Sequence, residues 1–138
     1  MAKKILAVSE SYDFYLIGIA CHYKDYRLCH EINSNTNLNL KREDDLEIFD
    51  NKTVSPILFS LYKFQNEDSD LFYLITNKSG INYLLPEQKQ IDFFLLIKNI
   101  SNHIDYDELI KQLKSIPIII GIFVLNPKRL KSKKHLVF

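Results

Sequence analysis

The sequence predicts a single α+β domain, with a mainly antiparallel or mixed sheet of about six strands and two main helices. Three observations lead to this prediction. Short apolar runs rich in aromatic and β-branched residues recur along the chain, which is typical of strands. Two other segments show the spacing of amphipathic helices. The 138 residues are the usual length of one domain, and no linker or repeat divides them. We therefore assign residues 1–138 to one domain, with a ferredoxin-like arrangement preferred.

The first expected strand is the apolar run at residues 14–20, in which Gly18 indicates a bulge or a close backbone approach. One long helix from Ser11 is the alternative, because Phe14, Ile17, Cys21 and Leu28 also fit a helical stripe. A surface helix is expected from residue 24 to about residue 33. The polar cluster at residues 33–37 favours its end, because such side chains compete for backbone hydrogen bonds.

The middle of the chain predicts a meander of strands. Apolar and polar residues alternate over residues 38–48, with an interruption at the acidic residues 43–45. Two further strands are expected at residues 57–64 and 71–76. The polar residues 65–70 between them are typical of a hairpin loop.

The last third of the chain predicts a turn, a strand, a helix and another strand. The turn is expected at residues 77–80. Residues 91–97 are apolar at nearly every position, which predicts a central strand covered on both sides. Residues 105–115 predict a helix with acidic residues in its first turn, where the helix dipole favours them, and Pro117 stops it. Residues 118–125 are expected to form the last long strand, again apolar on both faces.

The end of the chain is strongly basic. The first 127 residues contain 17 acidic residues against 13 Lys and Arg, whereas the last eleven residues contain five basic residues and no acidic one. Asn126-Pro127 predicts the N-cap and first-turn proline of a short helical segment. We expect Leu130 and the apolar end of the chain to dock this segment on the body; a protein contact and then an RNA contact are the alternatives. Its candidate contact residues are Lys128, Arg129, Lys131, Lys133 and Lys134.

The stretch from Leu84 to Phe93 reads Leu-Leu-Pro-Glu-Gln-Lys-Gln-Ile-Asp-Phe. It resembles the motif that names the bacterial IPExxxVDY protein family, and residues 16–19, 24–28 and 130–134 also resemble blocks of that family, in the same order. The resemblance implies the fold of that family and no assigned activity. The motif residues are Leu85, Pro86, Glu87, Ile91, Asp92 and Phe93, in which Leu85, Ile91 and Phe93 replace Ile, Val and Tyr.

The two carboxylates of this motif invite a hypothesis of acid–base catalysis. Glu87 and Asp92 are five residues apart, and an odd offset in an extended chain places side chains on opposite faces. We therefore expect a structural role. Pro86 ends one segment, Glu87 caps or pairs locally, and Asp92 accepts hydrogen bonds from backbone donors near the start of a strand.

The sequence contains no other recognisable catalytic or cofactor signature. The nucleophile-elbow, phosphate-loop, dinucleotide-binding and zinc-protease motifs are all missing, so no catalytic residue and no cofactor is assigned. Cys21-His22 and Cys29-His30 raise the question of a metal site. On a continuous helix these pairs would lie roughly 12 Å apart, which is too far for one zinc ion. We expect two free thiols and no metal.

Composition narrows the functional classes. With 46% hydrophobic residues and only 3 Gly, the chain is neither disordered nor fibrous. No signal peptide or membrane span is expected, and the cysteine content favours the cytoplasm. The leading hypothesis is a non-catalytic domain that binds a protein partner or its own copy, with Tyr26 and Arg27 as further candidate contacts. An accessory RNA-binding protein that uses the basic segment is the alternative, and an enzyme with an unrecognised site is the third.

Overall fold

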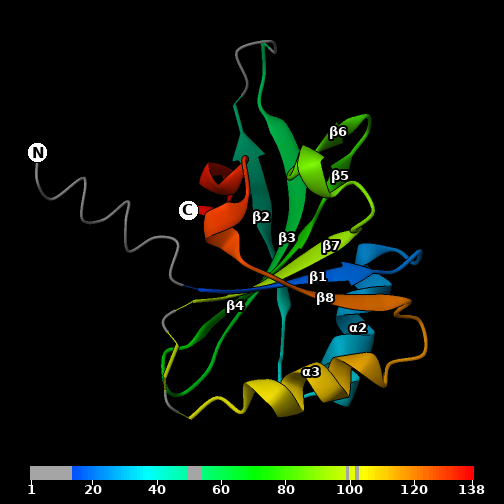
Figure 1. Cartoon of the computed structure of the whole chain (residues 1–138), viewed down its shortest axis with the longest axis vertical. Helices are drawn as coiled ribbons and strands as arrows, with labels where there is room; N and C mark the ends of the chain where they lie inside the picture. Colours follow the sequence, from blue (N-terminus) through cyan, green and yellow to red (C-terminus); the bar gives the residue numbers. More distant parts are fainter. Residues whose placement is uncertain (1–13, 50–53, 99, 102) are drawn as a thin grey trace, which may run out of the picture.

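The structure is a computed structural model that describes residues 14–49, 54–98, 100–101 and 103–138. Within these residues, two α-helices accompany a six-stranded antiparallel sheet and a small separate hairpin (Figure 1). The predicted α+β class is confirmed. The strands of the sheet are β1 (Tyr15–Ala20), β2 (Lys41–Ile48), β3 (Ile57–Gln65), β4 (Leu71–Thr76), β7 (Phe93–Lys98) and β8 (Gly121–Leu125), and the helices are α2 (Asp25–Asn35) and α3 (Tyr106–Lys114).

The sheet has the strand order β2-β3-β4-β7-β1-β8. Within it, β1, α2, β4, β7, α3 and β8 follow one another as in a ferredoxin-like fold, with the strands in the order β4-β7-β1-β8. The expected arrangement is therefore present. The β2–β3 hairpin is inserted between α2 and β4, and it extends the sheet beyond β4.

Each face of the sheet has its own apolar core, since successive strand residues point to opposite sides. On one face, Ile17 of β1 and Leu95 of β7 pack against both helices. On the other face, Leu16 and Phe94 pack against residues 84–91 and against the end of the chain. Figure 1 shows the helices together on one side, with the hairpin of β5 (Lys78–Ser79) and β6 (Asn82–Tyr83) and the C-terminal turns on the other. The prediction of a central strand covered on both sides is confirmed for β7, which begins two residues later than expected.

Residues 15–20 are extended, so the alternative of a continuous helix through this segment is wrong. Gly18 marks a close approach, as the sequence predicted. A Cβ atom at this position would lie 2.4 Å from Cδ1 of the buried Ile91. The glycine therefore lets β1 lie directly beneath the motif.

Helix α2 runs two residues past its predicted end. The Asn33 side chain does not break the helix. Its amide nitrogen donates to the Leu40 carbonyl at 3.0 Å, and its oxygen accepts from the Leu40 N–H at 2.9 Å. Asn33 therefore ties the helix to the following segment. In α3, the Asp105 carboxylate accepts from the Glu108 N–H at 3.0 Å and so caps the helix, whereas the sequence predicted only that acidic residues would lie in its first turn.

Two predicted irregularities take a different form in the structure. Strand β2 begins at Lys41, later than expected, and its predicted interruption appears as a shift of register between Glu43 and Leu46. The predicted turn at residues 77–80 contains β5 (Lys78–Ser79), which pairs with β6 (Asn82–Tyr83) across Gly80. Gly80 has a φ of 60°, a conformation that glycine adopts without strain.

Strand β8 is shorter than predicted and less covered. It spans residues 121–125 because Ile116 and Ile119 close a turn around Pro117, with the Ile119 N–H donating to the Ile116 carbonyl at 3.1 Å. The strand lies at the edge of the sheet, beside β1. Apolar residues on both faces therefore do not mean burial on both faces here.

Candidate functional site

The motif is organised around Asn77, a fully buried polar residue that the sequence did not single out. Its side-chain nitrogen donates to the carbonyls of Gln88 at 2.9 Å and Ile91 at 2.8 Å, and its oxygen accepts from the Leu85 N–H at 2.9 Å. These bonds fold the motif around the short 3-10 turn η1 (Pro86–Gln88). Leu85 and Ile91 are completely buried beneath it.

Asp92 joins the start of β7 to two other segments. Its Oδ2 accepts from the Cys21 N–H at 2.9 Å, and its Oδ1 lies 3.0 Å from Nζ of Lys78. The prediction that Asp92 accepts a backbone hydrogen bond near a strand start is confirmed. The hydrogen bond to Asp92 raises the pKa of Lys78, so Lys78 is charged at neutral pH. A cavity of about 560 Å³ opens beside the pair, and its other polar lining includes His22, Asp25, Ser60, Thr76 and Ser79.

The two thiols are buried and chemically quiet. Burial raises the pKa of Cys21 and of Cys29, so both remain protonated at neutral pH, whereas the thiolate is the nucleophile and the metal ligand. Cys29 Sγ lies 3.5 Å from the Leu40 carbonyl oxygen, to which it donates. In the part of the chain that the structure describes, no three His, Cys, Asp or Glu side chains are grouped to hold a metal ion.

Glu87 joins its own turn to the end of the chain. Its Oε2 accepts from the Ser132 N–H at 2.7 Å, across 45 positions of sequence, so it has a distant partner that the sequence did not predict in addition to the local bond from its own backbone. Burial acts to raise the pKa of Glu87, but hydrogen bonds from Ser132, from its own backbone and from the Lys131 backbone outweigh it and lower the pKa. Asp92 and Glu87 therefore bind different segments of the chain.

The last eleven residues, here called the tail, are docked on the sheet, as the sequence predicted. Asn126 caps the 3-10 turn η2 (Pro127–Arg129), and a second turn, η3 (Lys133–Leu136), follows. Leu130 and Leu136 are buried in the core that lies under the motif. Val137 and Phe138 stay about two-fifths exposed, so they contribute less to docking than the apolar sequence predicted.

Lys98 and His135 also hold the tail. Lys98 Nζ donates to the Leu136 carbonyl at 3.0 Å and lies 4.1 Å from the centre of the Phe138 ring. Burial lowers the pKa of Lys98 to about 8. Nδ1 of His135 lies 2.7 Å from the Leu84 carbonyl oxygen. The tail is therefore bound to both the sheet and the motif.

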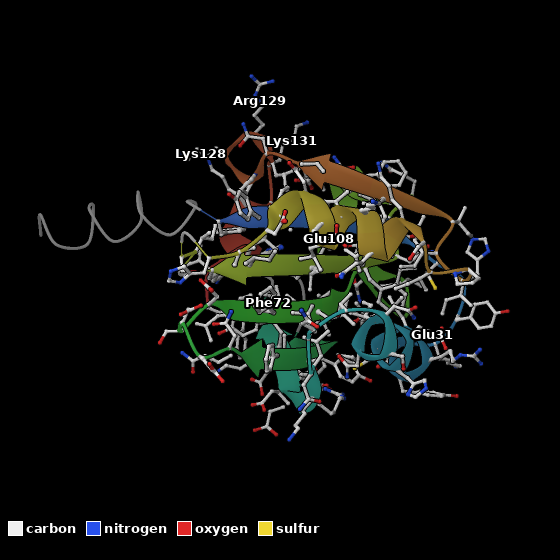
Figure 2. The ribbon with its side chains drawn as sticks, turned by 90° about the horizontal axis from the view of Figure 1, so that it is seen from below. Glu31, Phe72, Glu108, Lys128, Arg129 and Lys131 are labelled. Atoms are coloured by element: carbon white, nitrogen blue, oxygen red, sulfur yellow. The ribbon has the colours of Figure 1, made fainter. Side chains whose placement is uncertain are left out.

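The basic residues of the tail take different positions. Lys128, Arg129 and Lys131 project together from one end of the molecule, away from Glu31 on α2 and Glu108 on α3 (Figure 2). Lys133 Nζ donates to the Lys128 carbonyl at 3.2 Å. Lys131 and Lys134 line a cavity of about 570 Å³ between the tail and the β5–β6 hairpin.

Tyr26 and Arg27, the other candidate contact residues, lie on the outer surface of α2. The Arg27 guanidinium is 5.4 Å from the centre of the Tyr23 ring and 3.5 Å from the Glu31 carboxylate. Tyr26 is 66% exposed. Their spacing is that of an ordinary helix surface with local pairs.

Over the residues that the structure describes, the outer edge of β8 combines backbone that pairs with no other strand with exposed apolar side chains. Among the described residues, β8 has β1 on one side and no strand on the other. Ile120, Phe123 and Val124 are 64%, 41% and 63% exposed. The apolar run at residues 118–125 predicted a strand here but not its place at the edge of the sheet.

These features define an α+β domain of ferredoxin-like topology with a docked basic tail and an apolar edge strand. Comparisons with family models, curated proteins and solved structures find no match for the chain. Over the described residues, none of the helices has the length and apolar character needed to cross a membrane.

Proposed function

We propose that this protein is a non-catalytic binding domain that associates with a second copy of itself through strand β8. The observation that carries the proposal is the exposed, uncharged edge formed by Gly121–Leu125. A flat apolar edge offers unpaired N–H and C=O groups to another strand, and folded proteins usually protect such edges.

The opposite edge of the sheet supports this choice by contrast. Strand β2 has four exposed charged residues at its start and a shift of register between Glu43 and Leu46. Charges and bulges are the usual devices that prevent one sheet edge from joining another. Strand β8 has neither device, since its sequence is Gly-Ile-Phe-Val-Leu.

A second copy fits this edge when the two strands run antiparallel. The Leu125 end of one β8 then lies beside the Gly121 end of the other, and apolar residues face apolar residues across a two-fold axis. Because the tail follows Leu125 closely, the two basic tails lie at opposite ends of the paired strands. Parallel pairing would bring the tails together, where like charges repel.

Observations on the polar groups support a non-catalytic role. Asp92 is paired with Lys78, and Glu87 accepts a backbone N–H from the tail. The thiols of Cys21 and Cys29 are buried and protonated. These four groups are therefore bonded within the fold or buried in it. Membership of the IPExxxVDY family and a cytoplasmic location are part of the same proposal, and both rest on the sequence.

Sedimentation velocity over a range of protein concentrations tests self-association. We expect the unaltered chain to reach the mass of two copies, and Val124→Lys to remain at the mass of one copy because it places a charge in the apolar contact. Val54→Lys is the matched control, since Val54 is an exposed valine away from β8. A single-copy mass for the unaltered chain at every concentration would overturn the proposal, as would equal behaviour of the two variants.

A further inference from the structure

We propose that the cavity between the tail and the β5–β6 hairpin, here called the basic groove, binds a nucleotide unit, either free or within single-stranded RNA. Its lysines would contact phosphate, and its exposed aromatic side chains would stack on the base. This site lies on a different part of the molecule from β8, so it stands independently of the proposed self-association. The residues that line the groove and carry the argument are Phe49, Tyr83, Lys89, Lys131 and Lys134.

The cations of the groove come from distant segments. Lys89 follows the turn of the motif, whereas Lys131 and Lys134 belong to the tail. All three side chains are on exposed residues, and none of the described residues that line the groove is acidic. The rest of the chain before the tail has an excess of acidic residues. This local concentration of positive charge suits a phosphate group.

Aromatic rings lie beside these cations. Phe49 is 74% exposed, which is unusual for a large apolar side chain, and Tyr83 lies with its ring centre 5.5 Å from Lys89 Nζ. The tail contains no aromatic residue among its basic residues. The fold brings aromatic rings to them from β6 and from the residue that follows β2. Rings next to cations are the arrangement that binds successive bases and phosphates of a single strand.

The size of the groove agrees with this ligand class. Its volume of about 570 Å³ falls within the range of about 300–1,000 Å³ that is common for small-molecule sites. The buried Phe59 and the partly buried Ile57 form apolar parts of its wall. A flat base can therefore lie on an apolar surface while its phosphate meets the lysines.

Glu87 is a positioning residue for this site. By accepting the Ser132 N–H, it fixes the tail between Lys131 and Lys134. The two lysines then line the same groove as Lys89, which lies two positions after Glu87. The motif and the tail thus form one surface.

Fluorescence anisotropy with a labelled ten-residue oligouridylate at low salt tests the groove. We expect the double variant Lys131→Gln and Lys134→Gln to bind at least about tenfold more weakly, with a shallower salt dependence. The matched control is Lys41→Gln with Lys111→Gln, which removes the same charge from exposed lysines outside the groove. It should bind almost as well as the unaltered chain. Phe49→Ala should bind about tenfold more weakly through lost stacking.

Uridine monophosphate, followed by ligand-observed NMR, separates the two sources of the nucleotide. Binding of the monophosphate as tightly as the oligomer identifies a free nucleotide, and a strong preference for the oligomer identifies single-stranded RNA. Failure of both probes to bind the unaltered chain would overturn the proposal. Equal losses in the two lysine pairs, or no loss in Phe49→Ala, would also overturn it, because binding would then be non-specific charge attraction.

Discussion

Asp92 shows how one carboxylate at the start of an apolar strand can fix three segments. It accepts the Cys21 N–H at the end of β1 and pairs with Lys78 of β5. The two contacts differ in strength. Lys78 is about half exposed, so its ion pair is screened by water and contributes less than about 1 kcal/mol. The buried N–H of Cys21 matters more, because an unpaired buried donor costs about 1–3 kcal/mol.

We therefore predict that Asp92→Ala lowers the free energy of unfolding by about 1–3 kcal/mol, whereas Lys78→Met lowers it by less than about 1 kcal/mol. Urea unfolding measures both. Asp44→Ala is the matched control, since Asp44 is an exposed carboxylate on β2. Unchanged stability of Asp92→Ala, together with lost self-association, would mean that Asp92 serves binding and not the fold.

Glu87 gives a prediction about pH. Its folded pKa is lower than its unfolded pKa, because hydrogen bonds from the tail and from its own backbone outweigh the effect of burial. The stabilisation from ionised Glu87 is therefore fully present above the unfolded pKa of about 4.3 and is lost as the pH falls through the folded pKa. We expect Glu87→Gln to cost about 1 kcal/mol at neutral pH, a difference that shrinks below about pH 4.5.

The free energies of unfolding of the unaltered chain and of Glu87→Gln, measured from pH 3 to pH 8, check this pH dependence. Glu47→Gln, at an exposed position on β2, serves as the control and should show no such difference. A difference between Glu87→Gln and the unaltered chain that does not depend on pH would contradict the assigned role of the carboxylate.

At the residue scale, the sequence predicted what local chemistry determines. A polar residue at the start of an apolar strand indicated the role of Asp92, and a glycine within an apolar run indicated the close approach at Gly18. Ser132, the partner of Glu87 in the tail, lies 45 positions away, and no local sequence pattern predicts it. The role of Asn77 could not be predicted either. It lies in a polar turn, and its hydrogen-bond partners are backbone groups of the motif, which its neighbouring residues do not indicate.

At the scale of the elements, the tail is the segment whose docking most needs a test. Leu136 is completely buried, whereas its neighbour Val137 is 41% exposed. We predict that Leu136→Ala lowers the free energy of unfolding by about 2–5 kcal/mol, and that Val137→Ala lowers it by less than about 1 kcal/mol. Thermal unfolding measures the difference. Equal small effects, with fast amide exchange throughout the tail, would show a tail that is not docked.

The elements also show where the periodicity of apolar residues predicts the bounds and the exposure of a strand or helix, and where it does not. Strands β3 and β4 lie within one residue of their predicted bounds, because apolar runs between polar loops define them. The end of α2 was misplaced because the Asn33 side chain binds Leu40 instead of competing with its own helix. The exposure of β8 could not be predicted, because an apolar strand has the same sequence pattern at the centre and at the edge of a sheet.

At the scale of the whole molecule, the ferredoxin-like order followed from two strand–helix–strand units around a meander. The basic groove did not, because Phe49, Lys89 and Lys131 come from three separate segments. Tertiary packing forms the groove and leaves the edge of β8 exposed. The functions proposed for these two surfaces therefore depend on the structure more than on any sequence motif.

Residue-resolved amide hydrogen exchange over Gly121–Leu125, at high and at low protein concentration, tests the proposed pairing of β8 most directly. In an edge strand, alternate N–H groups point away from the sheet and exchange readily unless another strand binds them. We predict that these amides exchange at least about tenfold more slowly at high concentration, and that Val124→Lys abolishes this protection. Equally fast exchange at both concentrations, indistinguishable from that of Val124→Lys, would contradict pairing of β8 with a second copy.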